Sequence, residues 1–107
     1  MTAVGDRTES TVKTGLEYRP GSPVWVHVVR RGPRLSVSDH GAAFDAAGRP
    51  RRWHAAAQRV EQELDVNFSR SGAISLPVVR VGPPVDEVVL RIAAASRAFY
   101  QELLEAS

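Results

Sequence analysis

The stretch that decides the fold runs from Val24 to Gly48 and reads VWVHVVRRGPRLSVSDHGAAFDAAG. Side chains of an extended chain alternate between two faces, and both faces of the first part of this stretch are largely apolar. One face carries Val24, Val26 and Val28, and the other carries Trp25, His27 and Val29. A strand of this kind needs cover on both sides, or cover on one side and a partner on the other.

A turn, a second strand and a short helix follow this first strand. Glycine permits a positive φ and proline fixes its own φ, so residues 32–34 (GPR) predict a tight reversal and an antiparallel hairpin. Residues 35–38 alternate leucine and valine with serine, which predicts a half-buried return strand. Asp39 is placed to cap a helix that begins one or two residues later, and Gly48 is placed to end that helix in the left-handed conformation.

The rest of the chain adds one strand before this stretch and four elements after it. Residues 1–14 are polar without apolar periodicity, so they predict a mobile N-terminal tail ahead of a single domain formed by residues 15–107. The further elements expected are a short strand at 15–19, a helix opened by Arg49-Pro50, a hairpin at 66–78 and a long helix from about Pro84 to Glu105. The predicted fold class is α+β, an antiparallel sheet of four to five strands with helices on one face, in the order β-β-β-α-α-β-β-α.

Composition narrows the chemistry and the cellular setting. The chain has 107 residues, of which 43% are hydrophobic and none is cysteine. Disulfides and thiol catalysis are therefore excluded, and any zinc site would have to use histidines and carboxylates. No apolar run approaches the roughly 20 residues that span a bilayer, and the first ten residues lack the order of a signal peptide, so we expect a cytoplasmic protein. Arginine almost completely replaces lysine, which is typical of a GC-rich bacterial genome.

Charge is divided unevenly along the chain. Residues 19–59 carry eight arginines against two aspartates, a net charge of +6, whereas residues 60–107 have a net charge of −3. The arginines gather in two clusters: Arg30, Arg31 and Arg34, and Arg49, Arg51 and Arg52. If both clusters lie on one side of the molecule, they could bind the phosphates of a nucleic acid while Trp25 or Trp53 stacks on a base. The alternative is that the clusters are solvated and that Trp53 is the first core residue of its helix.

The candidate catalytic and metal-binding residues form no known motif. Asp39 and His40 invite a catalytic reading with Ser36 or Ser38 as nucleophile, but adjacent residues point in different directions and cannot orient one another as a triad requires. The three histidines, at positions 27, 40 and 54, match no compact metal motif. The patterns GxxxxGK[ST], GxGxxG and HExxH are all missing from the sequence. The sequence therefore predicts no enzyme, no cofactor and no metal site, with His27 as a hydrogen-bonded core or interface residue.

Three segments resemble a family of small bacterial and phage-borne domains of unknown function. In that family an alternating strand leads through a turn into an L-S-D-x-G segment and a short helix, matched here by Leu35, Ser38, Asp39 and Gly41, with two residues inserted after the leucine. A later strand of the family begins with the pattern G-V-x-h, where h is hydrophobic. Residues 65–68 (DVNF) match this pattern except for the glycine, and the spacing of apolar residues in the terminal helix also matches. The resemblance covers about residues 16–104 and implies no activity. The element order is also similar to that of type III secretion chaperones, a resemblance that implies homodimers that bind extended segments of other proteins.

The leading hypothesis is a non-enzymatic protein-interaction domain, acting as an adaptor, a chaperone-like protein or an inhibitor. We expect it to form a homodimer and to bind a partner protein through its sheet or an apolar edge, with Trp25, His27 and Val29 as the protein-binding residues. The alternative is a nucleic-acid-binding module that uses the two arginine clusters.

Overall fold

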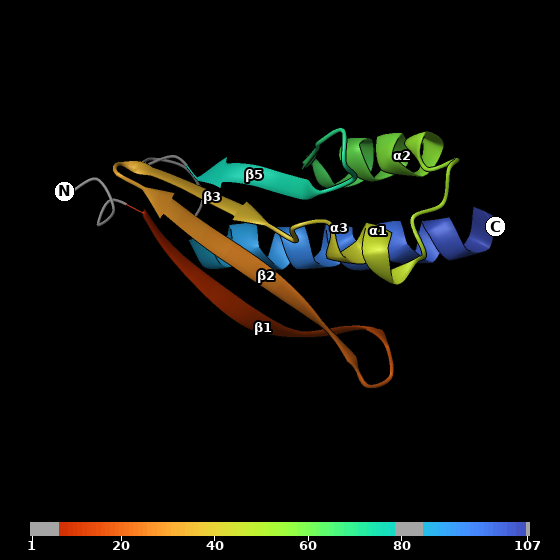
Figure 1. Cartoon of the computed structure of the whole chain (residues 1–107), viewed down its shortest axis with the longest axis horizontal. Coiled ribbons are helices and arrows are strands. Elements are labelled where there is room, and N and C mark those ends of the chain that lie inside the picture. Colours follow the sequence, from red (N-terminus) through yellow and green to blue (C-terminus); the bar gives the residue numbers. More distant parts are fainter. Residues whose placement is uncertain (1–6, 79–84, 107) are drawn as a thin grey trace.

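The computed structural model describes residues 7–78 and 85–106 and has the predicted order of elements (Figure 1). The elements are β1 (Arg7–Arg19), β2 (Ser22–Arg31), β3 (Arg34–Ser38), α1 (Ala42–Ala46), α2 (His54–Leu64), β4 (Asn67–Phe68), β5 (Ile74–Val78) and α3 (Val85–Ala106). The α+β class and the order β-β-β-α-α-β-β-α are confirmed.

The strands form one antiparallel sheet in the order β1-β2-β3-β5-β4. Only Gly32 and Pro33 separate β2 from β3, so the predicted tight reversal is confirmed. Gly32 has a φ of 57°, and a positive φ at the first central residue matches the twist of the two strands that the turn joins. β4 pairs with β5 only at Ile74 and Ser75, so Pro77, which has no N–H to donate, lies beyond the reach of β4.

The first strand is longer than the sequence indicated. β1 begins at Arg7, and residues 7–13 pair regularly with β2, from Arg7 opposite Arg31 to Lys13 opposite Trp25. Residues 7–14, which were assigned to the N-terminal tail, are therefore strand, whereas residues 1–6 lie outside the described residues. The segment lacks an apolar pattern because it is an edge strand, for which backbone pairing with β2 is enough to hold it in the sheet.

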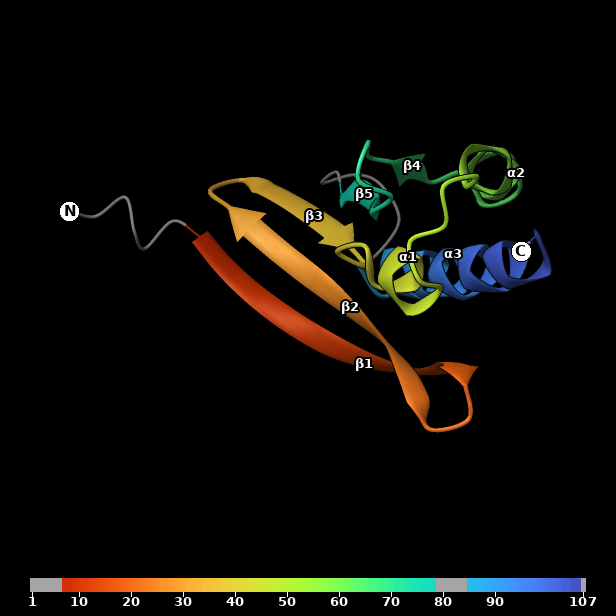
Figure 2. The same ribbon diagram turned by 45° about the vertical axis from the view of Figure 1, so that its right-hand side comes forward.

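Helix α3 packs against β1, β2, β3 and β5, while α1 and α2 pack against α3, with α2 lying beside β4 (Figure 2). The buried side chains of α3 are Val88, Val89, Ile92, Ala93, Ala95, Ser96, Phe99, Tyr100 and Leu103. They meet Val24 and Val26 of β2, Val37 of β3 and Ile74 of β5, which are all inaccessible to solvent. Within the described residues no helix is long and apolar enough to cross a membrane.

Helix α2 begins later than expected. It starts at His54 and not at Arg49-Pro50: Arg49 has a left-handed φ of 53°, and residues 50–53 precede the helix, with Trp53 as its N-cap. Trp53 is half-buried just before the helix and contacts the rings of Phe44 and Phe99, at centroid distances of 5.3 and 6.2 Å. The interpretation of Trp53 as a core residue is therefore confirmed.

Asp39 is not the helix cap that the sequence indicated. The residue at the N-cap of α1 is Gly41, and no side chain caps this helix. Asp39 is instead completely buried on the helix side of the sheet. Its Oδ1 accepts the backbone N–H groups of Gly41 and Ile74, each at 2.9 Å, and its Oδ2 accepts the hydroxyl of Ser96 at 2.7 Å.

Tyr18 completes this buried polar network. Because Ser96 uses its single hydroxyl proton on Asp39, the Tyr18 hydroxyl is the donor in the 2.7 Å bond to Ser96 Oγ. Burial raises the pKa of Tyr18 to about 12; the hydrogen bond with Ser96 acts in the opposite direction, and the charge of Asp39 raises the pKa further. Within the described residues, every buried side-chain polar atom has a hydrogen-bond partner. The network joins β1, the end of β3, β5 and α3.

We expect Asp39→Ala to destabilise the protein strongly. The substitution leaves two backbone N–H groups and one hydroxyl buried without an acceptor, at a cost of roughly 3 kcal/mol or more in unfolding free energy. Asp39→Asn keeps one acceptor oxygen and is expected to lose less. Urea denaturation measures both, with Asp45→Ala as the control, since that carboxylate is exposed and its pair with Arg49 is worth at most about 1 kcal/mol. Equal losses for Asp39→Ala and Asp45→Ala would contradict the structural role of Asp39.

Tyr18 should make the protein sensitive to alkaline pH. Its folded pKa of about 12 lies above the ordinary value of 10, so its contribution to stability is complete below about pH 10 and is lost as pH rises toward 12. We expect the difference in unfolding free energy between the wild type and Tyr18→Phe to shrink by up to about 1.4 kcal/mol per pH unit in this window. Urea unfolding at several pH values measures it. A constant difference across the window would show that Tyr18 titrates normally.

Candidate functional site

The sheet face opposite the helices, which we call the outer face, carries the residues singled out in β2. His27 pairs with Thr11 of β1 on one side and with Ser38 of β3 on the other, so these three side chains form a row across the sheet. The neighbouring rows carry Lys13 beside Trp25 and Glu9 beside Val29. The outer face is therefore mostly polar, as is usual for the solvated side of an antiparallel sheet.

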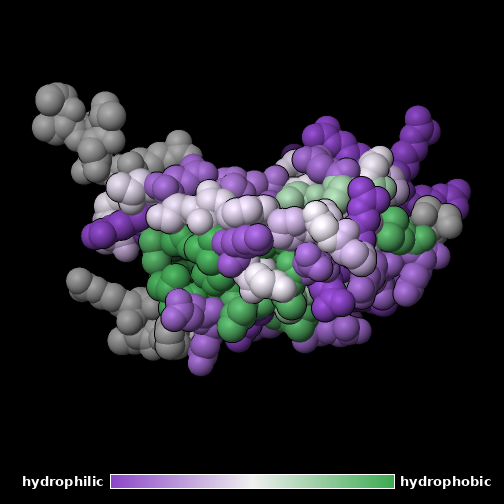
Figure 3. Space-filling model, turned by 90° about the horizontal axis from the view of Figure 1, so that it is seen from below, coloured by the Kyte–Doolittle hydropathy of each residue, from purple (hydrophilic) through white to green (hydrophobic). Residues whose placement is uncertain are grey.

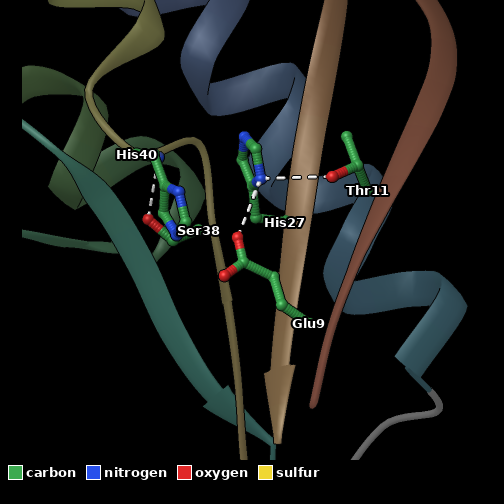
Figure 4. A network of polar contacts seen from close by, with 5 residues as sticks. All are labelled: Glu9, Thr11, His27, Ser38 and His40. Carbon is green, nitrogen blue, oxygen red and sulfur yellow. Dashed lines mark hydrogen bonds and ion pairs between the residues drawn. The ribbon is translucent and has the colours of Figure 1, made fainter. Parts of the chain in front are cut away.

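Two histidines and a carboxylate meet at the centre of the outer face (Figure 4). The ring of His40, from the loop after β3, stacks on the ring of His27 with a centroid distance of 3.9 Å and an interplanar angle of 6°. On β1, Glu9 Oε2 lies 3.6 Å and Thr11 Oγ1 3.5 Å from His27 Nδ1. One ligand atom from each of Glu9, His27 and His40 can be chosen such that all three lie within 4.8 Å of one another. We call these three residues the His-His-Glu cluster.

The surroundings of His27 keep its imidazole neutral. Burial lowers its pKa below the ordinary value of 6.5, and the adjacent ring of His40 lowers it further. The charges of Glu9 and Asp39, and the hydrogen bond to Glu9, act in the opposite direction. The balance favours a neutral ring at neutral pH, which is the form that offers a nitrogen lone pair to a ligand.

The backbone of the loop after β3 determines the position of His40. His40 has a φ of 53°, in the left-handed region that residues other than glycine seldom adopt. Its N–H donates to Ser38 Oγ at 2.9 Å, and the N–H of Gly41 donates to Asp39 Oδ1. These bonds hold the loop so that Asp39 points into the core while the ring of His40 lies over His27.

Sequence reasoning treated the three histidines separately and missed this cluster. Thirteen residues separate His27 from His40, and only the hairpin register, with Ser38 opposite His27, brings them together. Glu9 lay in the segment assigned to the tail. His54 lies apart on α2, exposed and stacked on Trp53 at a centroid distance of 4.3 Å.

The other two predicted protein-binding residues lie on either side of His27 on the same face. Trp25 is 42% exposed. Val29 is half-buried and lines a surface hollow together with Pro77 and Val78. A single chain therefore leaves this side of β2 partly uncovered, while polar residues of β1 and β3 surround the two apolar side chains.

The two arginine clusters do not form one surface. Arg30, Arg31 and Arg34 flank the turn between β2 and β3, whereas Arg49, Arg51 and Arg52 lie in the connection from α1 to α2, at the opposite end of the molecule in Figure 1. Arg49 also pairs with Asp45, with Nε 2.5 Å from Oδ1. The two clusters therefore do not combine into one phosphate-binding surface, and nucleic-acid binding by either cluster alone stays a prediction.

The residues considered for catalysis are separated as well. Asp39 is buried on the helix side of the sheet, while His40 is exposed on the outer face, so the two cannot act as a dyad. Ser38 Oγ accepts the N–H of His40, and Ser96, which does contact Asp39, is inaccessible to solvent. No nucleophile and base face each other at an accessible surface in this group.

A third surface lies at the edge of the sheet. Among the described residues, β1 pairs only with β2, so its other edge has unpaired backbone groups. Seen from below Figure 1, where β1 is the lowest strand, the molecule has an apolar area bordered by hydrophilic residues (Figure 3). Val12 and Leu16 of β1 are half-buried at this edge, on the side that faces α3.

Helix α3 adds exposed leucines to the same side of the molecule. The ring of Tyr100 contacts the ring of Tyr18 on β1 at a centroid distance of 5.2 Å, so this flank of α3 faces β1. Leu104 lies one turn beyond Tyr100, and Leu90 lies about four turns before Leu104, so both share this flank. They are 48% and 56% exposed.

Comparisons of the chain with protein-family models, with curated proteins and with solved structures find no significant match. The resemblances drawn from residues 35–41 and from the order of elements therefore remain predictions.

Proposed function

We propose that this chain is a non-enzymatic protein-interaction domain that forms a homodimer by pairing β1 with the β1 of a second copy. The observation that carries the proposal is the 13-residue edge strand with an apolar flank beside it. An unpaired strand edge is a template for another strand, and an edge that pairs with itself in antiparallel fashion generates a closed twofold dimer.

The sequence of β1 is complementary to itself in one antiparallel register. With Thr11 opposite Thr11 of the second copy, Glu9 lies opposite Lys13 and, by symmetry, Lys13 lies opposite Glu9. Facing threonines and facing opposite charges both stabilise antiparallel pairs. Moving the twofold axis to Ser10 would instead place Arg7 opposite Lys13, and like charges in that position are unfavourable.

The same arrangement covers apolar surface on the helix side. Joining the two β1 strands places the two α3 helices on one face of a continuous sheet, with the flanks that carry Leu90 and Leu104 turned toward the twofold axis. Each copy then supplies apolar cover for the edge of the other. A second copy is therefore a fitting occupant for both the strand edge and the apolar flank.

We also propose that the dimer binds a partner protein in the bacterial cytoplasm. A dimer of this kind leaves the outer face, with Trp25, His27 and Val29, open for a partner protein. The separation of Asp39 from His40 supports a role without catalysis. The arginine-rich composition supports a bacterial origin, and a domain held by an apolar core without cysteine suits the reducing cytoplasm.

Lys13→Glu should dissociate the dimer. It places a second carboxylate opposite that of Glu9 at two symmetric positions, and we expect the dimer dissociation constant to rise by about tenfold or more, because each pair changes by up to roughly 1 kcal/mol. Sedimentation velocity over micromolar concentrations, in the presence of EDTA, measures the change. The charge-reversed variant Glu9→Lys/Lys13→Glu should restore the wild-type value.

Trp25→Arg distinguishes the strand edge from the outer face. We expect this variant to dimerise like the wild type, because Trp25 projects away from the edge, whereas Leu90→Asp should weaken the dimer. A wild-type chain that stays monomeric across the range would refute the homodimer. Dissociation by Trp25→Arg without an effect of Lys13→Glu would move the interface to the outer face. Circular dichroism confirms that each variant is folded.

A further inference from the structure

We propose that Glu9, His27 and His40 form a binding site for one zinc ion, or a divalent transition metal of similar preference, on the outer face of the sheet. The site needs only side chains of one chain, so it does not depend on the dimer proposed above. The cluster shares Glu9 with the proposed β1 contact and His27 with the proposed partner-binding face, so zinc binding and dimerisation are measured separately.

The ligand types and their placement favour such an ion. Neutral imidazoles together with a carboxylate are ligands that zinc accepts, and two histidines with one glutamate make a recognised zinc ligand set that leaves a coordination position for water. The three residues come from β1, β2 and the loop after β3. The carboxylate of Glu9 supplies a negative charge to this ligand set, which a divalent cation favours.

The distances require only small movements of the side chains. The three ligand atoms lie within 4.8 Å of one another. Ligand atoms on one tetrahedral zinc lie about 3.3 Å apart, since the bonds to nitrogen are about 2.0–2.1 Å long. The cluster therefore has to contract by roughly 1.5 Å at most. Glu9 and His40 have exposed side chains, which leaves them room to move toward the half-buried His27.

Binding also requires the stack of the two rings to open. The lone pair of an imidazole nitrogen lies in the plane of its ring, so one ion cannot lie in the planes of two rings that are parallel and 3.9 Å apart. His40 is the ring that turns, because its backbone N–H is held by Ser38 while its side chain is exposed. Metal binding is therefore expected to convert a stacked pair into two rings tilted around one ion.

The ligand set also specifies which ions should fail to bind. Imidazole nitrogen suits zinc, copper and nickel, whereas Mg²⁺ and Ca²⁺ prefer shells made only of oxygen. The cluster offers one carboxylate and two nitrogens. We therefore expect Zn²⁺ to bind and Mg²⁺ at the same concentration not to bind.

Zinc competition with a chromophoric chelator tests the site on the full chain after treatment with EDTA and removal of the chelator. We expect one Zn²⁺ per chain. His27→Gln and His40→Asn should each weaken binding by about 100-fold, at least as much as the loss of an outer-shell partner costs. Asparagine suits position 40 because it tolerates the left-handed backbone there. His54→Gln removes the remaining histidine of the chain, far from the cluster, and should leave binding unchanged.

Proton NMR gives a second readout that does not depend on affinity. Zinc should shift the ring protons of His27 and His40, with loss of the mutual ring-current effect of the stack, while those of His54 stay in place. A cobalt-loaded protein should show the visible absorption of a tetrahedral site, and this absorption should be missing from His40→Asn.

The zinc site and the dimer can fail separately. Leu90→Asp should bind zinc as tightly as the wild type even where it is monomeric, because Leu90 lies on α3, away from the sheet face that carries the cluster. Equal zinc affinity in the wild type, His27→Gln and His40→Asn would overturn the proposal. A shift of the His54 ring protons at a lower zinc concentration than those of His27 and His40 would overturn it too. Neither result would bear on the oligomeric state measured in EDTA.

Discussion

A buried carboxylate that is satisfied by hydrogen bonds holds this fold together. Asp39 lies in a position from which solvent is excluded, and such a group is tolerated only when hydrogen bonds replace its hydration. Its three donors come from Gly41 of its own loop, Ile74 of β5 and Ser96 of α3. Because Ser96 in turn accepts the hydroxyl of Tyr18, one network fixes the position of α3 against three strands of the sheet. The requirement to satisfy this charge defines a single packing of helix on sheet.

Periodicity predicted most of this architecture because the core residues follow it closely. The valines of β2, the alternation in β3 and β5, and the apolar positions of α3 all report burial on one face, and each element was found. β1 was predicted too short because Val12 is the single apolar residue among residues 7–14, so no alternating pattern marks this part, which backbone pairing with β2 holds in the sheet. The start of α2 was placed too early, since proline in a first turn predicted a helix from Arg49-Pro50, whereas the helix begins at His54 after Trp53.

Sequence periodicity predicted much less of the candidate site. The role of Asp39 depends on a hydrogen bond from Ser96, 57 residues later in the chain. From its neighbours in the sequence alone, Asp39 is better explained as a helix cap. The stack of His27 on His40 depends on the register of the hairpin and on an unusual φ at His40. Glu9 joins them only because β1 extends to Arg7. Each of these conditions is tertiary, so composition and spacing could show only that any metal site must use histidine and carboxylate ligands.

The loop between Ser38 and Gly41 connects the interior to the outer face. Asp39 and His40 are adjacent in sequence and point to opposite sides of the sheet, as successive residues at the end of a strand do. The left-handed backbone at His40 then turns the chain toward α1. That conformation costs on the order of 1–2 kcal/mol for a residue with a Cβ atom. The hydrogen bonds that Asp39 accepts from Gly41 and Ile74 offset the cost, because they can form only when the loop has this shape. The position of the histidine ring on the surface is therefore determined by a charge buried in the core.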